Sequence, residues 1–362
     1  MYSIPAHQPR IRVAVLGASG YVGGEVLRLL LGHPAVEVVA VTAPSAAGEP
    51  VIRTHPHLER LTELRFQADL SVREAAELDA IFLALPHGAA MERVPALLDA
   101  GGTGGPHGDG PVLFDLSGDF RLKDPAAFHE YYGIEQTAPY WAERAAYGLT
   151  EWNREAIRAA RLVACPGCFP TGALLALTPL ARAGMLAGPV VIDSKTGSSG
   201  SGKEPGEGTH HPTRAADFRA YGLFTHRHRP EISQELGKCR PHGTGPLQVT
   251  FAPHSAPMVR GIFTTAYAFP AEPISQADLT ALYEEAYAGA WFVRLVESSR
   301  VAVVAHSNFC DIRARTDGAG TIIVTSALDN LVKGGAGQAV QNMNVAFGWP
   351  EQSGLTFPGT LP

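Results

Sequence analysis

The pattern of apolar and polar residues divides the chain into two parts. In the first part, residues 11–16 (IRVAVL) and 36–42 (VEVVAVT) are apolar runs rich in β-branched residues, typical of strands buried on both faces of a parallel sheet. A glycine-rich turn and a predicted helix to about Leu31 lie between them. Residues 79–88 and 111–120 predict further strands that end in turns. This order of elements predicts a doubly wound α/β domain.

The pattern changes from about Cys165 onward. Residues 170–184 predict a helix that begins at a proline, ends at a glycine and is kinked at Pro179. The runs PVVIDSKTG, PLQVTFAP, GIFTTAYAF and TIIVTSALDN alternate between apolar and polar residues, which favours a mixed or antiparallel sheet. A second domain is therefore expected over 165–333. Residues 333–349 predict a last helix, entered through a glycine turn.

Composition narrows the class of protein. A chain of 362 residues predicts two domains, and 45% hydrophobic residues are enough for a packed core. The net charge of −6 gives no reason to expect nucleic acid or an anionic membrane as partner. No apolar run reaches the length of a membrane span, and the first residues, MYSIPAHQPR, do not resemble a secretory leader. We expect a cytoplasmic protein with reduced thiols.

The stretch GASGYVG follows the first predicted strand and opens the first predicted helix. Gly17, Gly20 and Gly23 would let the backbone approach a dinucleotide pyrophosphate, held by the amides and dipole of the helix N-terminus. The alternative is a glycine turn that binds no ligand. The second strand ends in VTAPS, without the acidic residue that binds an NAD ribose. NADP is therefore the expected cofactor, with Ser45 near its 2′-phosphate.

Two of the four cysteines, Cys165 and Cys168, lie three positions apart in ACPGCFPT. A zinc site would need further ligands, and Cys239 and Cys310 each stand alone, so no metal is expected. Cys168 falls at or just before a helix N-terminus, where the dipole and free amides favour a thiolate. We expect Cys168 to be the nucleophile and Cys165 a bystander. The alternative is that Cys168 is simply a small buried residue.

The segment THRHRPEI offers a proton partner for such a thiol. His226 and His228 would share one face if this segment were extended. Glu231 could then orient an imidazole, as the third member of a catalytic triad does. A metal site built from these three residues is the rival interpretation, with an incomplete ligand set.

Four polar side chains are candidates for binding an anionic substrate. Ser117 and Arg121 follow a predicted strand, at the edge where doubly wound sheets bind ligands. Lys203 lies in the Gly/Ser-rich stretch SKTGSSGSGKEP, and Arg260 lies in PMVRGI. Each basic residue has the alternative of being an exposed surface charge.

Seven motifs occur in order over nearly the whole chain: GASGYVGGEVLRLL, LALPHG, DLSGDFRL, PGCFPTGALLAL, HRHRPEI, RGI and DNLVKGGAGQAVQNMN. Together they resemble the N-acetyl-γ-glutamyl-phosphate reductase family of the aspartate-semialdehyde-dehydrogenase superfamily. The resemblance implies an α/β Rossmann NADP-binding domain over 1–164, completed by 334–362. It also implies an α+β catalytic and dimerisation domain with a mixed sheet over 165–333.

The resemblance implies a reaction as well. Cys168 attacks an acyl phosphate, phosphate leaves, and NADPH delivers hydride to the resulting thioester, so that an aldehyde is released. The pair His226 and His228, with Glu231, supplies acid–base function. The substrate is a small-molecule acyl phosphate, and the assembly is a homodimer or homotetramer. The residues that fall where the family binds NADP are Ser19, Gly20, Tyr21, Val22, Gly23 and Asn330.

The chain also departs from the family pattern. Pro44 stands where an arginine is usual, Cys165 where asparagine is frequent, and SKTGSSGSGK replaces SGVSGAGR. Two rival functions stay open. One is a homologous reductase of carrier-protein-linked aminoadipyl phosphate in lysine synthesis, although PGCFPT is more similar to the arginine enzyme. The other is a non-enzymatic, NADP-responsive redox sensor that uses Cys165 and Cys168.

Overall fold

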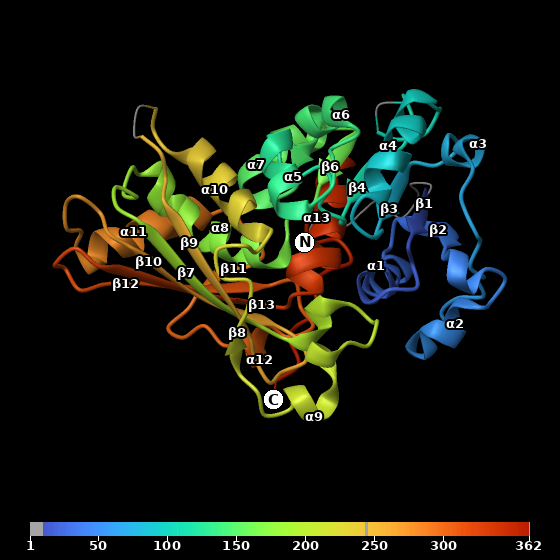
Figure 1. Ribbon diagram of the computed structural model, residues 1–362. Helices are drawn as coiled ribbons and strands as arrows, with labels where there is room; N and C mark the ends of the chain where they lie inside the picture. Colours follow the sequence, from blue (N-terminus) through green and yellow to red (C-terminus); the bar gives the residue numbers. More distant parts are fainter. Residues whose placement is uncertain (1–9, 107, 243–244, 362) are drawn as a thin grey trace. The chain divides into compact units, whose positions relative to one another are not determined.

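The computed structural model describes residues 10–106, 108–242 and 245–361 (Figure 1). The chain separates into two compact units, which are described one by one. The first unit is Met1–Pro166 with Gly335–Thr356, and the second is Gly167–Gly334 with Phe357–Pro362.

The first unit is built on a parallel sheet, whose strands occur in the order β2-β1-β3-β4-β6-β5 within the described residues. Every strand pair in this sheet is parallel. The strands are β1 (Ile11–Leu16), β2 (Val36–Thr42), β3 (Ala80–Leu83), β4 (Val112–Asp115), β5 (Ala146–Tyr147) and β6 (Leu162–Ala164). Because β2 lies on one side of β1 and β3 on the other, the connections reverse direction at β1 and β3. Doubly wound sheets bind ligands beyond the carboxyl ends of the strands at such a point.

Helices pack on both faces of doubly wound sheets, and the apolar runs of this sheet are buried accordingly. All four residues of β3 and all four of β4 are buried. The helices of this unit are α1 (Tyr21–Leu31), α2 (Val51–Thr54), α3 (Val72–Ala75), α4 (Ala89–Asp99), α5 (Pro125–Tyr132), α6 (Pro139–Arg144), α7 (Thr150–Ala159) and α13 (Gly337–Ala346). Helix α13, near the C-terminus, packs against α7, α1 and β4, so Gly335–Thr356 complete the first unit.

The second unit contains a mixed sheet, with the strand order β11-β12-β13-β10-β7-β9-β8 in the part of the chain that is described. The pairs β7–β9 and β11–β12 are parallel and the others antiparallel. The mixed sheet expected from the sequence is therefore confirmed. Its strands are β7 (Val190–Thr196), β8 (Arg219–Ala220), β9 (Val249–Ser255), β10 (Ile262–Ala268), β11 (Val293–Leu295), β12 (Cys310–Thr316) and β13 (Ile322–Leu328).

One face of this sheet is covered by helices. Burial alternates strictly along β7, β9 and β10, as expected for a sheet with one packed face. Helices α8 and α10 pack on each other and on this sheet, and α11 packs on β12 (Figure 1). The helices of the second unit are α8 (Cys168–Arg182), α9 (His211–Arg214), α10 (His228–Cys239), α11 (Gln276–Tyr287) and α12 (Val301–Val304). The residues of the opposite face are half-buried.

Three local expectations need correction. Helix α8 begins at Cys168, two residues earlier than predicted, and continues through Pro179 to Arg182. The segment around His226 is not extended, because His228 already begins α10. The last helix is entered through one turn of π-helix, Val332–Ala336, before α13 starts at Gly337. In the described part of the chain, no helix is long and apolar enough to span a bilayer.

Candidate active site

The glycine turn after β1 packs so closely on its neighbours that no side chain fits at Gly17 or Gly23. Gly17 has φ +77°, and a Cβ there would lie 2.3 Å from the carbonyl oxygen of Ala84. A Cβ on Gly23 would lie 2.5 Å from the carbonyl oxygen of Gly17, so the turn and the first turn of α1 are in direct backbone contact. The amides of Gly17 and Ala18 both donate to the carbonyl of Thr42, at 3.1 and 2.9 Å. The turn is therefore held against both neighbouring strands.

The start of α1 has the properties of an anion site. Its N-cap is Gly20, which carries no side chain to cap the first amides of the helix. Ser19 and Val22 are half-buried and Tyr21 is exposed, so these residues border the turn without filling it. The turn lies at the carboxyl end of β1, where the connections of the sheet reverse direction. The residues present fit the pyrophosphate of a dinucleotide. Ser45 is exposed in the short helix Pro44–Ala46 that follows β2.

Cys168 is the first residue of α8, which agrees with the prediction that it lies at or just before a helix N-terminus. Its N-cap is Gly167, which has extended backbone angles and no side chain to cap the helix. The thiol therefore lies where backbone amides and the helix dipole favour a negative charge. Gly334 lies directly against it, since a Cβ on Gly334 would be 2.8 Å from Cβ of Cys168. Gly334 belongs to the glycine-rich stretch KGGAG, but its spacing in the sequence gives no sign that it lies against Cys168.

Cys165 has a different environment. It is buried, its amide donates to the carbonyl of Asp115 at 2.8 Å, and its carbonyl accepts from Nε of Arg121 at 2.7 Å. Its sulfur lies 3.7 Å from Nδ2 of Asn342. Burial first, and the nearby Asp115 carboxylate second, raise the pKa of the Cys165 thiol to about 12. Cys165 is therefore a protonated thiol at neutral pH, with the structural role of a small buried residue.

Both histidines predicted as proton partners lie in an aromatic cluster beside Cys168. Their ring centroids are 4.8 Å apart, and Phe169, which follows Cys168, contacts both rings at 5.5 and 5.8 Å. A Cβ on Gly167 would lie 2.4 Å from Nε2 of His228, so this imidazole rests on the backbone next to the nucleophile. Burial, and then the charge of Arg227, lower the pKa of His226 to about 4. His226 is therefore neutral near pH 7, and its Nδ1 accepts a hydrogen bond from the amide of His228 at 3.1 Å, which leaves the ring proton on Nε2.

Glu231 is fully buried on α10, one turn after His228. Its Oε1 accepts a hydrogen bond from the amide of Gly167 at 2.8 Å. The carboxylate thus fixes the backbone that immediately precedes the nucleophile. The segment THRHRPEI predicts that Glu231 orients an imidazole, and it gives no sign of this main-chain contact. The second unit therefore brings together Cys168, His226, His228 and Glu231.

The predicted anion-binding residues have different surroundings. Ser117 and Arg121 are buried at the end of β4, and Nη2 of Arg121 donates to the carbonyl of Leu116 at 3.0 Å. In the second unit, Lys203 is exposed, and Nη1 of Arg260 lies 3.3 Å from Oδ2 of the fully buried Asp329.

Asn330, expected at the cofactor, makes two internal contacts in the second unit. Its Oδ1 accepts from the amide of Gly261 at 2.7 Å, and its Nδ2 donates to Oγ of Ser199 at 3.0 Å. The side chain of Asn330 thus joins the loop after β7 to the start of β10.

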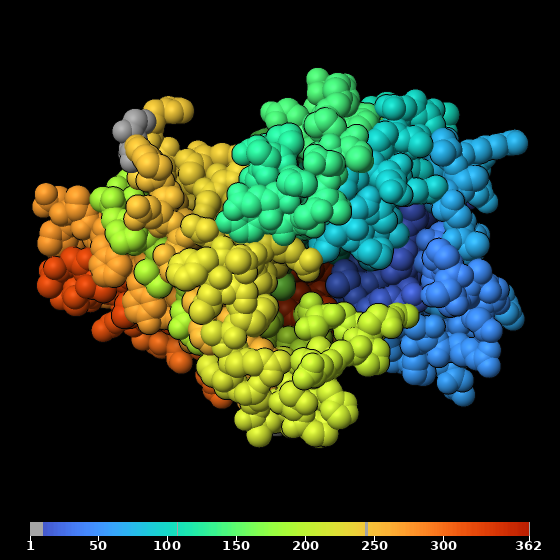
Figure 2. All heavy atoms as spheres, viewed as in Figure 1, coloured from blue at the N-terminus to red at the C-terminus, as the bar shows by residue number. Residues whose placement is uncertain are grey.

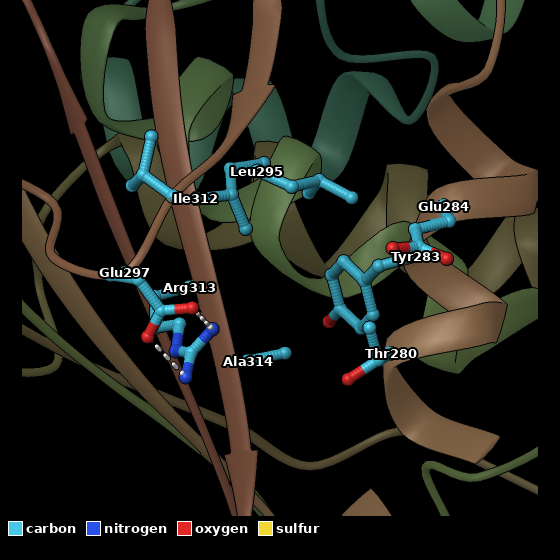
Figure 3. A pocket seen from close by; sticks show the side chains of 9 residues that line it. Thr280, Tyr283, Glu284, Leu295, Glu297, Ile312, Arg313 and Ala314 are labelled. Carbon is cyan, nitrogen blue, oxygen red and sulfur yellow. Dashed lines mark hydrogen bonds and ion pairs between the residues drawn. The ribbon is translucent and has the colours of Figure 1, made fainter. Parts of the chain in front are cut away.

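A separate pocket lies between α11 and β12 (Figure 3). Leu295, Ile312 and Ala314 line it with apolar side chains, and the Glu297 carboxylate pairs with the Arg313 guanidinium at 2.8 Å. The hydroxyl of Tyr283 donates to the carbonyl of Ala176. None of the residues lining this pocket was predicted to be catalytic, so it is not the candidate active site.

Comparisons with known proteins agree with this description. Residues 12–160 match the family "Semialdehyde dehydrogenase, NAD binding domain", and residues 168–330 match "Semialdehyde dehydrogenase, dimerisation domain". Aspartate semialdehyde dehydrogenase II from Vibrio cholerae, solved in complex with ASA, shares the fold with a TM-score of 0.69 at 17% identity, over 93% of this chain and 98% of that chain. The enzyme from Candida albicans, solved with NADP, has a TM-score of 0.62 at 14% identity, over 93% and 98%.

Curated relatives match at much higher identity. The N-acetyl-gamma-glutamyl-phosphate reductase of Methanopyrus kandleri is 46% identical over 97% of this chain and 99% of the relative, and that of Methanothrix thermoacetophila is 45% identical over 97% and 100%. A LysW L-2-aminoadipate 6-phosphate reductase from Thermomicrobium roseum is 44% identical over 97% and 99%.

The two family matches together span most of the chain, one over the unit with the parallel sheet and one over the unit with the mixed sheet, so the protein is a member of the semialdehyde dehydrogenase class. Within that class, the chain belongs to the N-acetyl-γ-glutamyl-phosphate reductase family.

Proposed function

We propose that this protein reduces N-acetyl-γ-glutamyl phosphate to N-acetylglutamate 5-semialdehyde with NADPH, releasing phosphate, on the route to arginine. The observation that carries the proposal is Cys168 at the first turn of α8, packed against Gly334 and beside two imidazoles. A thiol in that position can form the thioester that this reaction needs. The identity of the substrate is proposed from the names of the relatives at 45–46% identity.

The first half-reaction is acyl transfer to sulfur. One imidazole of the His226 and His228 pair takes the thiol proton of Cys168, and the thiolate attacks the acyl carbon. The C–O bond to phosphate breaks and inorganic phosphate leaves with the electron pair. Glu231 contributes by fixing the Gly167 amide, and with it the backbone that carries the thiolate.

The second half-reaction is reduction of the thioester. Bound NADPH supplies the hydride. The imidazolium formed in the first step protonates the oxygen of the acyl group as negative charge develops there. When the imidazole takes that proton back, the C–S bond breaks, the aldehyde leaves, and Cys168 is regenerated.

The cofactor would be held by the glycine turn and the start of α1. The residues proposed for this role are Gly17, Ser19, Gly20, Tyr21, Val22, Gly23, Ser45 and Asn330. Support comes from the N-cap of α1, Gly20, which leaves the first amides of the helix without a side-chain cap, and from the close backbone packing at Gly17 and Gly23 that shapes the turn. The substrate would be held by Ser117, Arg121, Lys203 and Arg260, of which Arg121 and Arg260 are positioned by carbonyl and carboxylate contacts.

The nucleotide-binding and catalytic roles would be divided between two domains. Residues 1–164 with 334–362 would bind the nucleotide, and 165–333 would carry catalysis and assembly. The chain would form a homodimer or homotetramer in the cytoplasm. The half-exposed face of the mixed sheet offers a surface for a second copy, because no helix described in the second unit packs on it in the way α8 does on the opposite face.

A second candidate is reduction of carrier-linked aminoadipyl phosphate, favoured by the 44% identical relative from Thermomicrobium roseum. The redox-sensor alternative is disfavoured, because burial keeps Cys165 protonated.

One assay tests these candidates. NADPH oxidation is measured with enzymatically generated N-acetyl-γ-glutamyl phosphate and, in parallel, with carrier-linked aminoadipyl phosphate. We expect turnover of the acetylated substrate, phosphate release equal to NADPH consumed, and weaker turnover with NADH. Turnover of the carrier-linked substrate alone would establish the lysine-branch activity. No turnover of either, by a protein that binds NADPH, would contradict both enzyme assignments.

A further inference from the structure

His55 lies 37 residues after the glycine turn in the sequence but contacts it directly in the structure. Its Nε2 lies 2.8 Å from the carbonyl oxygen of Ala18, inside the stretch GASG. Because a carbonyl can only accept, Nε2 carries the proton and donates. The side chain is buried, with 6% of its surface exposed. His55 therefore contributes a buried hydrogen bond to the backbone of the turn itself.

The same imidazole rests on the first turns of α1. A Cβ built on Gly24 would lie 2.4 Å from Cε1 of His55 and 2.7 Å from its Nδ1. Glycine is a poor residue for a helix interior, so its presence at position 24 needs a packing reason. The ring of His55 occupies the space that any larger side chain would need. Phe66, at a centroid distance of 6.4 Å, packs against the edge of the ring.

The backbone around His55 explains how it is held. His55 ends α2, with its amide donating to the carbonyl of Val51 at 2.9 Å, and its own carbonyl accepts from Leu58 at 3.0 Å. The imidazole is thus fixed by two short helical turns. The glycine turn has a second attachment, because the amides of Gly17 and Ala18 donate to the carbonyl of Thr42 at the end of β2. Ala18 is bonded on both its amide and its carbonyl.

From these contacts we infer that His55 is a positioning residue for the cofactor: it fixes the Ala18 carbonyl, and so aims the following amides of Ser19 and Tyr21 at a dinucleotide pyrophosphate. The Ala18 carbonyl and the Ser19 amide belong to one planar peptide unit and point in opposite directions. A hydrogen bond that fixes the carbonyl therefore also fixes the direction of the Ser19 N–H. The inference rests on the proposed function, since it assumes that the glycine turn binds NADPH. It assigns a role to the insert between β2 and β3 that no pattern in the sequence suggested.

The test measures NADPH binding to the full-length protein by fluorescence titration, at a temperature far below the midpoint of thermal unfolding. We expect His55→Leu to raise the Kd and KM for NADPH about tenfold or more, because the turn loses a buried hydrogen bond. The kcat at saturating NADPH, the KM of the acyl phosphate and the alkylation rate of Cys168 should stay near those of the unchanged protein. His55→Gln, which keeps an N–H donor, should recover part of the affinity.

Two further variants separate positioning from general destabilisation. Leu61→Ala truncates an exposed side chain of the same insert, six residues from His55, and should leave NADPH affinity unchanged. Gly24→Ala should weaken NADPH binding through displacement of the His55 ring, although alanine is otherwise preferred in helices. If His55→Leu and Gly24→Ala bind NADPH as tightly as the unchanged protein, the inference is wrong. If the unchanged protein does not bind NADPH, the proposed function fails instead.

Discussion

At the scale of single residues, the two cysteines of ACPGCFPT have opposite properties because of their backbone positions. Cys168 begins α8, where amides without side-chain caps favour a thiolate. Cys165 is enclosed, and its amide and carbonyl are bonded to Asp115 and Arg121. Cys168, whose position favours a thiolate, and Cys165, whose burial disfavours one, are thus only three residues apart in the sequence.

This difference predicts the outcome of two serine substitutions. Cys168→Ser should abolish nearly all turnover, because a hydroxyl at neutral pH is a weak nucleophile unless a base activates it. NADPH binding should be retained. Cys165→Ser should keep substantial activity, and iodoacetamide should label Cys168 first. Steady-state rates and peptide mass spectrometry measure both effects. Equal loss of activity in the two folded variants would show that the cysteines act as a unit.

A second prediction concerns Gly334, which lies against Cys168. Gly334→Ala would place a Cβ 2.8 Å from Cβ of Cys168 and must displace one of them. Overpacking of this kind costs about 1–3 kcal/mol of stability, and we expect kcat to fall while NADPH affinity is unchanged. The control is Gly237→Ala in α10, where an added Cβ meets nothing within 4 Å. That variant should be as active as the unchanged protein and slightly more stable, by thermal unfolding. Full activity of Gly334→Ala would contradict the assigned contact.

At the scale of elements, α1 and α13 show how distant parts of the sequence form one packed unit. His33, just after α1, places Nε2 3.0 Å from Oδ1 of Asn344 in α13, and its ring stacks on Trp349 at 5.6 Å. The amide of Ala35 donates to Nδ1 of the same ring at 3.2 Å. The imidazole is thus bonded as the neutral tautomer with its proton on Nε2. Burial lowers the pKa of His33 to about 4, although the bond to Asn344 opposes that shift.

This pair predicts acid sensitivity of the first unit. The pKa of His33 is lower in the folded protein than its ordinary value of 6.5, so its protonation favours unfolding. Its contribution is complete above pH 6.5 and is lost as the pH falls toward 4, by up to roughly 3 kcal/mol. The unfolding midpoint in urea should therefore drop over this range. His33→Gln should be less stable at pH 7 but show a smaller drop, and an unchanged slope would contradict the assignment.

At the scale of the whole molecule, the mixed sheet has one face packed by helices and one half-exposed face. Asp193 on β7 pairs with Lys195 at 2.9 Å and with Nδ1 of His254 on β9 at 3.0 Å, and Phe218 stacks on the His254 ring. The yellow-green segment that contains Phe218 lies at the surface of the molecule (Figure 2). This half-exposed face, with an aromatic ring stacked beside paired charges, is the surface that we propose for contact with a second copy.

The corresponding prediction concerns assembly. Thr265→Glu introduces a charge on the half-exposed face of β10 without touching the packed face. We expect it to shift sedimentation velocity profiles toward the monomer, since an unpaired charge in an interface is costly. Ala281→Glu, at an exposed position of α11, is the matched control and should leave the profile unchanged. An unaltered oligomer in Thr265→Glu would place the interface elsewhere.

The sequence by itself determined the features that depend on neighbours along the chain. Apolar runs and glycine spacing predicted β1, the turn and α1, because strand burial and turn closure are short-range properties. The order of Pro and apolar residues after Cys168 located the helix start for the same reason. The tertiary structure decided which distant groups meet. Gly334 against Cys168, Glu231 on the Gly167 amide, and His55 on Ala18 each join residues 37 or more positions apart. Such contacts depend on how helices and strands pack in three dimensions, and a local pattern of residue types does not specify that packing.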